Sequence, residues 1–281
     1  MNLHRDTSEI FVPDALPPDQ ALKRTTHLAV AAHQDDIEIM AANPILECFQ
    51  RSDRWFTGVV VTDGRGSPRN GIYGRYDDEE MRLVRFKEQR KAAMIGEYAA
   101  QIMLDYPSNE VKGSSTLPVD DLATILKATR PQQVYTHNLA DKHDTHVGVA
   151  LKVIAALRSL PRELRPQKLY GCEVWRGLDW MLDSDKVGFD LSGQENLQAA
   201  LLGVFDSQIS GGKRYDQASL ARRKANATYF ESHGLDITTG LSFGLDMTGL
   251  ILDDGKEPLA FIREFIQRFM QDVTDRLQRV S

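Results

Sequence analysis

The sequence predicts an α/β fold in which a mainly parallel central sheet is covered by helices. Short apolar runs rich in valine, leucine and isoleucine alternate with longer segments of helical periodicity along most of the chain. That alternation is the pattern of βαβ units. The chain also has 281 residues, of which 42% are hydrophobic. This is enough for one large domain with a sizeable core.

The predicted strands are short and apolar, as strands buried between two helical layers should be. TGVVVT is the clearest of them, because its valines are β-branched. In chain order, the predicted strands are HLAVAA (27–32), TGVVVT (57–62), QIMLDY (101–106), QQVYTH (132–137) and KLYGCEVW (168–175).

Helices are predicted between these strands. In the segment 43–51, Asn43 is expected as the N-cap and Pro44 at the first helical position, where its missing N–H costs nothing. The segment 77–98 begins with a cluster of acidic residues, which suits the helix dipole. The other predicted helices in this part of the chain are 118–131 and 144–160.

The two ends of the chain lie outside this alternation. Residues 1–24 are polar and proline-containing, and we expect an arm over the surface with one short strand at EIFV. Because no linker or repeat interrupts the sequence, we expect a single domain over 1–281, with a core at 27–208 and a C-terminal helical elaboration at 209–281. The elements expected in this last part are a charged helix at 217–233, a hairpin or loop at 240–255 and an amphipathic helix at 258–280.

The charge and composition exclude several classes of function. A net charge of −6 argues against nucleic acid as the main partner, although it is compatible with a local basic pocket. The two cysteines, Cys48 and Cys172, exclude a disulfide framework but leave one bridge open. The N-terminal residues lack the apolar centre of a secretory signal, and no apolar run approaches the ~20 residues of a membrane span. We therefore expect a cytoplasmic protein without a membrane span.

Charged residues gather where two predicted strands end. The first group is His33, Asp35 and Asp36 after strand 27–32, and the second lies in THNLADKHDTH (136–146) after strand 132–137. In a parallel sheet these ends share one edge, where ligands bind. Each group alone is typical of a helix cap or a solvated surface. Together they indicate a divalent metal site.

The chemistry of these residues fits catalytic zinc. Zinc accepts histidine nitrogen and carboxylate oxygen, and a catalytic site keeps three protein ligands and one open position. His33, Asp36 and one histidine of the second group can supply the ligands. Asp35 can act as the base, and a further histidine as the acid. The spacing alone does not decide between His143 and His146 for the last two roles.

Several stretches resemble, in the right order, the signatures of the PIG-L/LmbE-like family of zinc-dependent N-acetylglucosamine deacetylases. AAHQDDIEIM (31–40) is similar to that family's Ala-His-Pro-Asp-Asp-Ile-Glu-Ile-Gly, and DKHDTHVGVA (141–150) to its Asp-x-His-Pro-Asp-His-x-x-x-Ala. The resemblance implies a Rossmann-like three-layer fold. Further similar stretches are VVVTDG (59–64), VRFKEQRKAAMIGEY (84–98), FDLSG (189–193) and ALLGVFDSQ (200–208).

The resemblance also implies a role for each matching residue. His33, Asp36 and His146 correspond to the family's metal ligands, and Asp35 to its general base. His143 corresponds to the residue that acts as general acid or stabilises the oxyanion. The implied reaction is removal of an acetyl group from an N-acetylated amino sugar by water that Zn²⁺ activates. Iron, cobalt or manganese would also suit such a ligand set.

The implied substrate is a small molecule containing N-acetylglucosamine, contacted by Arg85. Two other classes of function stay open. One is an amidase for another N-acyl substrate, or a phosphoesterase, with the same ligands. The other is a non-catalytic module that binds a sugar or a metal. The sequence does not decide the oligomeric state, and a homo-oligomer is compatible with it.

The chain departs from the family pattern at four positions. Gln34 replaces a proline and Met40 a glycine, while Asp144 and Thr145 stand where the family has a proline and an aspartate. That aspartate would raise the pKa of His143 and keep it protonated. Asp144, one position earlier, and Asp141 are the two candidates to replace it.

Two segments near the same sheet edge are candidates for substrate recognition. The loop 64–80 is long and rich in glycine and arginine, and it is typical either of a substrate lid or of a solvated loop. The arginines of this loop could bind an anionic or polar substrate. In WRGLDW (175–180), either tryptophan could stack on a sugar or pack into the core. The arginines of the loop are Arg65, Arg69 and Arg75.

Overall fold

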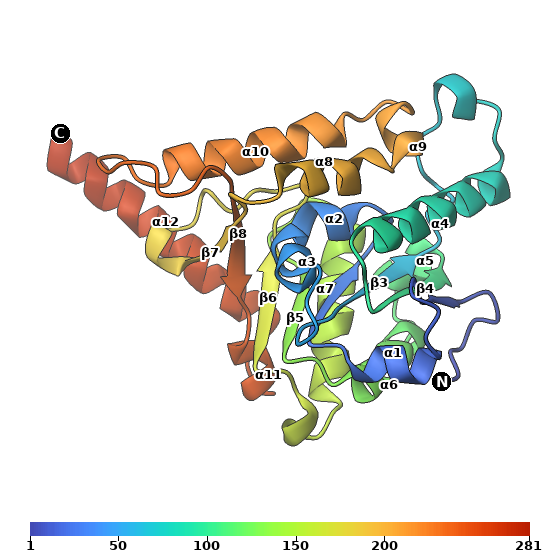
Figure 1. Ribbon diagram of the computed structural model, residues 1–281. Coiled ribbons are helices and arrows are strands. Elements are labelled where there is room, and N and C mark those ends of the chain that lie inside the picture. Colours follow the sequence, from blue (N-terminus) through green and yellow to red (C-terminus); the bar gives the residue numbers. More distant parts are fainter.

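The computed structural model describes residues 1–281 as an eight-stranded sheet with helices on both of its faces (Figure 1). The strand order across the sheet is β1-β4-β3-β2-β5-β6-β8-β7. The predicted α/β class is therefore confirmed. The strands are β1 (Glu9–Phe11), β2 (His27–Ala31), β3 (Phe56–Thr62), β4 (Ala100–Tyr106), β5 (Gln133–His137), β6 (Lys168–Cys172), β7 (Lys186–Asp190) and β8 (Leu241–Asp246).

The central strands β4, β3, β2, β5 and β6 run parallel to one another. β1 pairs antiparallel with β4 at one edge, and β8 pairs antiparallel with β6 and β7 at the other. From β2 the chain first builds outward through β3 and β4, and then returns to build β5 and β6 on the other side. The carboxyl ends of β2 and β5 thus border the position where the strand order reverses, which is where open α/β sheets bind ligands.

The helices form two layers. The longer ones are α4 (Asp78–Ile95), α6 (Leu117–Thr129), α7 (Asp144–Arg158), α10 (Tyr215–Tyr229) and α12 (Pro258–Val280). The others are α1 (Pro18–Lys23), α2 (Asp36–Met40), α3 (Ala42–Cys48), α5 (Ser108–Lys112), α8 (Glu195–Gly203), α9 (Asp206–Ile209) and α11 (Gly249–Leu252), with 3-10 turns at Gly71–Tyr73, Arg162–Leu164 and Asp183–Asp185.

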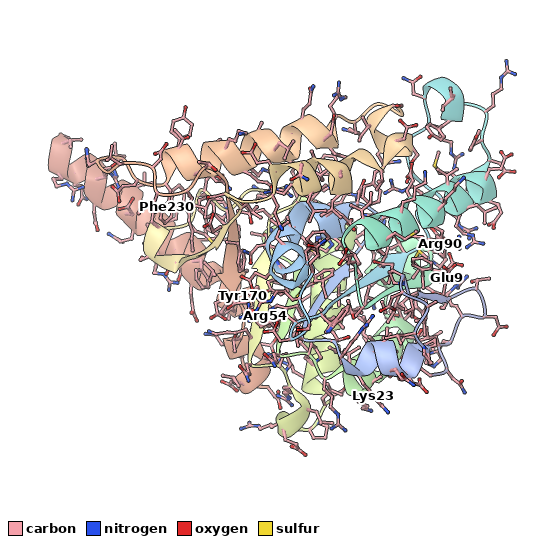
Figure 2. All side chains as sticks on the ribbon, in the orientation of Figure 1. Glu9, Lys23, Arg54, Arg90, Tyr170 and Phe230 are labelled. Atoms are coloured by element: carbon pink, nitrogen blue, oxygen red, sulfur yellow. The ribbon has the colours of Figure 1, made fainter.

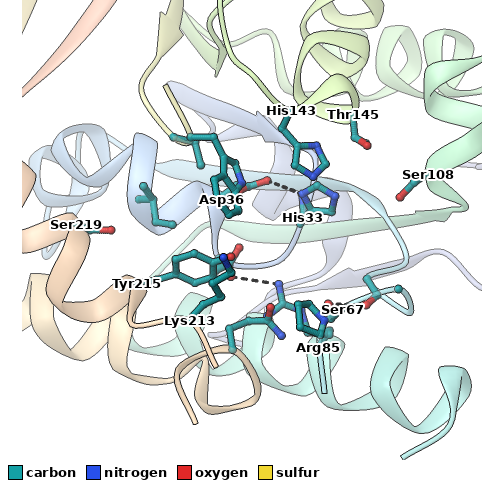
Figure 3. Close-up of a pocket in the computed structure, with 18 of the residues that line it drawn as sticks. His33, Asp36, Ser67, Arg85, Ser108, His143, Thr145, Lys213, Tyr215 and Ser219 are labelled. Carbon is teal, nitrogen blue, oxygen red and sulfur yellow. Dashed lines mark hydrogen bonds and ion pairs between the residues drawn. The ribbon is translucent and has the colours of Figure 1, made fainter. Parts of the chain in front are cut away.

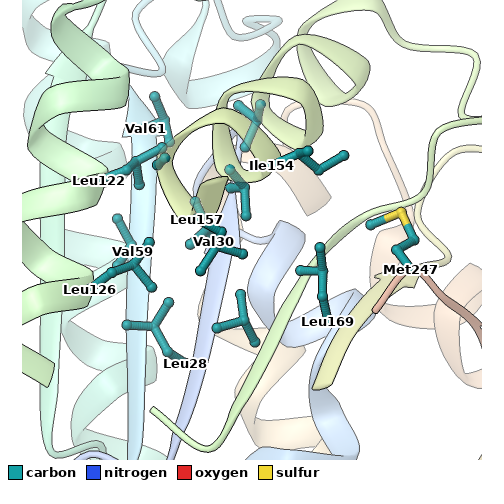
Figure 4. Packing of buried hydrophobic residues seen from close by; sticks show 14 of the residues in the cluster. Leu28, Val30, Val59, Val61, Leu122, Leu126, Ile154, Leu157, Leu169 and Met247 are labelled. Atoms are coloured by element: carbon teal, nitrogen blue, oxygen red, sulfur yellow. The ribbon is translucent and has the colours of Figure 1, made fainter. Parts of the chain in front are cut away.

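Alternation along the strands divides the hydrophobic core into two parts. Leu28 and Val30 of β2 point to one face, where they pack against α6 and α7 (Figure 4). Ala29 and Ala31 point to the other face, where α2, α3, α4 and α8 contribute side chains. Because both faces are covered, every residue of β2 is buried. This explains why the sequence of β2 is almost entirely apolar.

Most predicted elements lie within one or two residues of their expected bounds, but the start of α3 was wrong. The helix begins at Ala42, so Asn43 is inside it, and the Asn43 amide donates to the Asp190 carbonyl at 3.0 Å. The acidic start of the next helix is confirmed as a capping box between Asp77 and Glu80. At the sheet edge, Arg90 of α4 forms an ion pair with Glu9 of β1 (Figure 2), which ties the N-terminal arm to the body.

The last third of the chain is more than a helical elaboration. The segment 240–255, expected as a hairpin or loop, holds β8 and α11, and β8 joins the main sheet. α12 packs on the core through Phe261 and Ile262 and then runs along the side of the molecule to the C-terminus (Figure 1). None of the helices combines the length and apolar character that crossing a membrane requires. Cys48 and Cys172 are both buried and free.

Candidate metal centre and active site

The two charged junctions of the sequence meet at the carboxyl ends of β2 and β5. His33 and Asp36 lie at the turn from β2 into α2, and His143 lies just before α7 (Figure 3). His146 lies in the first turn of α7. Asp36 and His146 are buried, whereas the His33 side chain is 22% exposed. The group therefore forms the floor of an open site.

Three ligand atoms of this group form a nearly equilateral triangle. His33 Nδ1 lies 3.2 Å from Asp36 Oδ2 and 3.2 Å from His146 Nε2, and the third side, His146 Nε2 to Asp36 Oδ2, is 3.3 Å. Zinc bound tetrahedrally at its usual distances requires ligand atoms about 3.3 Å apart. The three residues therefore fit a single zinc-sized cation. The fourth tetrahedral position would face the open side.

His146 is held from behind by a buried carboxylate. Its Nδ1 lies 3.5 Å from Asp141 Oδ2, so that Nε2 is turned toward Asp36. A carboxylate behind a histidine ligand is a common way to fix the ring and its tautomer. The same Asp141 accepts the main-chain N–H groups of Trp175 and His143 at 3.1 and 2.9 Å. Asp141 thus joins the loops after β5 and β6 to the centre.

His137, Asp141 and His146 form a second group with metal-ligating atoms, but it fits a metal less well. His137 Nε2 accepts the main-chain N–H of Ala32 at 2.8 Å, and its ring stacks on His146 at 3.8 Å. None of the three lines the cavity at the site. His137 therefore supports the turn after β2 and the ring of His146.

The electrostatics of the triangle favour a cation. Burial alone would raise the pKa of Asp36, but the adjacent His146 and His33 hold it well below its ordinary value. Burial alone would lower the pKa of His146, but Asp36 and Asp141 raise it to about 9. The carboxylates therefore keep a positive charge at this point, and a bound metal ion would replace the proton that supplies it.

Asp35 lies beside the triangle in a strained conformation. Its φ of 100° is in the left-handed half of conformational space, which aspartate rarely adopts. The turn keeps Asp35 at the cavity, where its Oδ2 lies 3.3 Å from Arg85 Nη2. Burial is the main cause that raises the pKa of Asp35 to about 7, against the opposing effect of Arg85. A carboxyl group with such a pKa can accept a proton near neutral pH.

Arg85 is a buried guanidinium of α4 that reaches the floor of the cavity. It donates to the Gln34 carbonyl and lies 3.7 Å from Glu88. Its Nη1 and Nε have no hydrogen-bond partner within the protein. Arg85 therefore positions Asp35 and keeps two buried donors without a partner. The predicted contact with substrate is compatible with this position and stays a prediction.

His143 does not have the carboxylate partner that the sequence suggested. The Asp144 side chain is exposed, and the Asp141 carboxylate accepts only the main-chain N–H of His143. Burial, together with nearby His146 and His33, lowers the pKa of His143. The expected rise of its pKa is therefore not found. The ring stacks on His146 at 4.6 Å, and its Nδ1 has no protein partner.

A cavity of about 690 Å³ opens above these groups. The predicted site residues His33, Asp35, Asp36, Arg85 and His143 all line it, and His146 lies directly beneath. Its other walls come from the loop after β3, from α5, from the segment between β5 and the start of α7, from the loop after β6, and from α10 and the loop before it. They include Gly64, Gly66, Ser67, Pro68, Ser108, Lys112, Lys142, Thr145, Val174, Trp175, Lys213, Tyr215 and Arg222.

The arginines of loop 64–80 are not part of this lining. Arg65 pairs with Asp63 at 2.6 Å, and Arg69 pairs with Asp78 at the start of α4. The loop contributes main chain and small side chains instead. The two tryptophans also differ: Trp175 lines the cavity, whereas Trp180 packs against α12.

Gln34, which stands where the family has proline, is buried in the turn. Its amide donates to the Thr62 carbonyl at 3.0 Å. A side-chain carbon on Gly64, whose φ is +69°, would lie 2.3 Å from the Gln34 Oε1 atom. The glycine of the TDG turn is therefore required both by its backbone conformation and by the glutamine beside it.

Sequence reasoning missed several residues of this site. Asp141 was considered only as a partner for His143. Lys213, Tyr215 and Arg222 were not considered, because they belong to a part of the chain where no motif was recognised. The only local signal is the cluster Lys213–Tyr215, which leads into the first residue of α10.

A family comparison agrees with this geometry. Residues 28–157 match the family described as PIG-L: GlcNAc-PI de-N-acetylase. Over this region the chain is therefore similar to the PIG-L family. The matched PIG-L region contains both charged junctions and the whole of β2 to α7 except for the first residue of β2 and the last of α7. This family is one of deacetylases.

Known proteins similar to this chain include deacetylases and one enzyme of another kind. The uncharacterized deacetylase YaiS of Escherichia coli K12 is 28% identical over 158 residues, which are 54% of this chain and 79% of YaiS. The N,N'-diacetylchitobiose deacetylase of Pyrococcus horikoshii has a similar structure (TM-score 0.64, 14% identity, 82% of this chain and 86% of that one). The 4-carboxy-2-hydroxymuconate hydratase GalB of Pseudomonas putida KT2440 also shares the fold (TM-score 0.62, 15% identity, 79% and 96%).

Proposed function

We propose that this protein is a metal-dependent hydrolase that removes an acetyl group from an N-acetylated amino sugar of the N-acetylglucosamine type. The observation that carries the proposal is the triangle of His33, Asp36 and His146 at the floor of an open cavity, with the Asp35 carboxyl group beside it. The similarity of residues 28–157 to a deacetylase family supports the reaction type. Zinc is the proposed ion.

His33, Asp36 and His146 would hold the ion, and Asp141 would keep the imidazole of His146 turned toward it. When bound, zinc supplies a water of lowered pKa and polarises the carbonyl of the acyl group. The residues of the chain carry out the proton transfers. Asp35, held by Arg85, takes the proton of the attacking water.

His143 is positioned to act on the oxygen or nitrogen of the acetamide. Its lowered pKa favours the neutral ring, which still has one N–H to donate. We infer that this N–H stabilises the developing oxyanion. The amine then leaves with a proton that has passed through Asp35.

The upper walls of the cavity suit a sugar ring. Trp175 and Tyr215 meet edge to face, with ring centres 6.1 Å apart, and both line the cavity. An aromatic wall can pack on the apolar face of a pyranose while the hydroxyl groups reach polar neighbours. We also infer that residues 1–281 form one domain of Rossmann-like character, because strands from residue 9 to residue 246 share one sheet.

The alternative is an amidase that acts on a different N-acyl compound. The fold alone does not decide the reaction, since the hydratase GalB shares it. The test is release of acetate from a panel of N-acetylglucosamine compounds by zinc-loaded and chelator-treated protein. We expect zinc-dependent acetate release from at least one of them. Release of another acid from other N-acyl compounds, with no acetate, would establish the alternative; no zinc binding would overturn both.

A further inference from the structure

Positive charge is concentrated in the walls of the cavity, although the protein as a whole carries a net charge of −6. Apart from Arg85, which is paired with Asp35, the lining contains four cationic side chains. The only carboxylates in the lining are Asp35 and Asp36, and both belong to the floor. The four cations are Lys112, Lys142, Lys213 and Arg222.

Two of these cations lie near the Trp175 ring, and a third contacts the preceding residue, Val174. The ammonium groups of Lys142 and Lys213 lie 5.9 and 5.1 Å from the centre of its ring. Lys142 comes from the loop before α7 and Lys213 from the loop before α10, and Figure 3 shows Lys213 on the side of the cavity opposite His143. Arg222 of α10 donates to the carbonyl of Val174. Cations from separate parts of the chain thus lie next to Trp175 and its neighbour Val174.

These cations lack counter-charges of their own. No carboxylate lies within ion-pair distance of Lys142, Lys213 or Arg222, although the protein contains many other ion pairs. Like charges around a partly enclosed cavity repel one another, and an anion bound among them would relieve that repulsion. Cations on a cavity wall without partners are therefore typical of a site for an anionic ligand.

The position of this group relates it to the reaction. The Trp175 ring lies 6.2 Å from the ring of His143, which borders the metal triangle. An anionic group among the cations would therefore be close to the reacting acetamide. It would be attached to the same sugar ring or to its immediate substituent.

We propose that the substrate carries an anionic group, a carboxylate or a phosphate, which Lys142 and Lys213 bind at Trp175 with support from Arg222. This inference rests on the proposed deacetylase function and specifies its substrate class. It differs from the prediction for Arg65, Arg69 and Arg75, whose side chains do not line the cavity.

The experiment compares three N-acetylglucosamine compounds with the zinc-loaded protein: the neutral methyl glycoside, a glycoside with a carboxymethyl group, and the 6-phosphate. We expect at least one anionic compound to exceed the neutral one in kcat/KM by about tenfold or more, because each charged hydrogen bond can contribute that much. The better anionic compound identifies the carboxylate or the phosphate. Equal values for all three, or the highest value for the neutral compound, would overturn the proposal.

The matched variants are K142Q/K213Q and K23Q/K127Q. Both remove two positive charges, but Lys23 of α1 and Lys127 of α6 are exposed and lie outside the cavity lining (Figure 2 shows Lys23). The ratio of kcat/KM for the anionic over the neutral compound should fall about tenfold in K142Q/K213Q only. An equal fall in both variants would assign the effect to net charge and contradict the proposal.

Binding of inorganic phosphate and of malonate, measured by calorimetry on the same proteins, separates the two proposals. If no N-acetyl compound is hydrolysed but K142Q/K213Q loses anion binding that K23Q/K127Q keeps, the deacetylase function fails and the anion site stands. If acetate is released but neither anion binding nor the substrate ratio depends on Lys142 and Lys213, the anion site fails and the deacetylase function stands.

Discussion

Asp141 lies directly behind His146: its Oδ2 is 3.5 Å from Nδ1 of the ring, whose Nε2 faces Asp36 at 3.3 Å. The carboxylate, the imidazole and the metal triangle thus follow one another in a line from the protein interior to the cavity. If His146 binds the proposed metal ion, this arrangement gives Asp141 a supporting role that its place in the sequence did not indicate.

Replacing Asp141 with asparagine should weaken zinc binding by about 10–100-fold, because the imidazole loses the charge that orients it and strengthens its basicity. The measurement is zinc affinity by competition with a chromogenic chelator. D144N is the matched control, since Asp144 is three residues further along the same segment and exposed. Equal zinc affinities in D141N and the wild-type protein would show that Asp141 only holds the loops.

Replacing Asp35 with asparagine should abolish acetate release while zinc stays bound. Asparagine keeps the size of the side chain but cannot take a proton from water. Zinc content is measured by elemental analysis and turnover by acetate release, on the same preparation. H146A should instead lose zinc, since it removes one corner of the triangle. Near-normal turnover of D35N would exclude Asp35 as the base.

The strained backbone at Asp35 should have a measurable effect on the free energy of unfolding. D35G and D35A both remove the carboxylate next to Arg85, but only glycine adopts a φ of 100° without strain. We expect D35G to be more stable than D35A by about 1 kcal/mol, even though glycine gains more entropy on unfolding. Urea denaturation of the metal-free proteins gives the comparison. A D35A variant as stable as D35G would mean that the turn relaxes.

The turn after β3 offers a second test of backbone geometry. Gly64→Ala should destabilise the protein by about 2 kcal/mol or more, because φ is +69° and the new methyl group would lie 2.3 Å from Gln34 Oε1. Gly66→Ala is the control, since nothing lies within 4 Å of the carbon it would add. In the double variant Q34A/G64A the clash with the Gln34 side chain disappears but the backbone strain stays. Only part of the lost free energy of unfolding should therefore be recovered.

His27 should contribute to acid sensitivity. His27 begins β2 in a buried position. Burial, and to a lesser extent the charge of Arg54, lowers its pKa to about 4. Its other neighbours are Glu47, 3.8 Å from its Nε2, and Cys48, 3.4 Å from its Nδ1. The unfolded chain then binds a proton at a pH where the folded one does not. Stability should therefore be unaffected above the unfolded pKa of about 6.5 and fall as the pH drops toward 4.

The loss due to His27 between pH 7 and pH 5 should be about 2 kcal/mol. It is measured as the difference between the wild-type protein and H27Q in the change of unfolding free energy over that range. This double difference removes the contributions of the metal ligands and carboxylates, which both proteins share. Parallel pH dependences in the two proteins would contradict the burial argument.

Periodicity was sufficient for the parallel core of the fold. Its strands are largely buried, mainly apolar runs, and such runs can be recognised in the sequence without tertiary information. They lie at 27–31, 56–62, 100–106, 133–137 and 168–172. The same periodicity does not indicate β7, and for β8 it predicts only a hairpin or loop. Both strands are antiparallel and their residues are less uniformly apolar. What makes them strands is the pairing of β8 with β6 on one side and with β7, the edge strand, on the other.

The sequence by itself determined which residue types stand at the ends of β2 and β5, since the rule that parallel strands end at one edge is general. Only the tertiary structure decided the distances of about 3.2 Å that bring His33, Asp36 and His146 together as candidate metal ligands, and the placement of Asp141 beside His146 and not beside His143. It also brought Lys213 and Arg222 to the cavity from more than sixty positions beyond His146. The physical reason is that side-chain direction and long-range packing depend on how the helices lie on the sheet. No local sequence pattern predicts this arrangement.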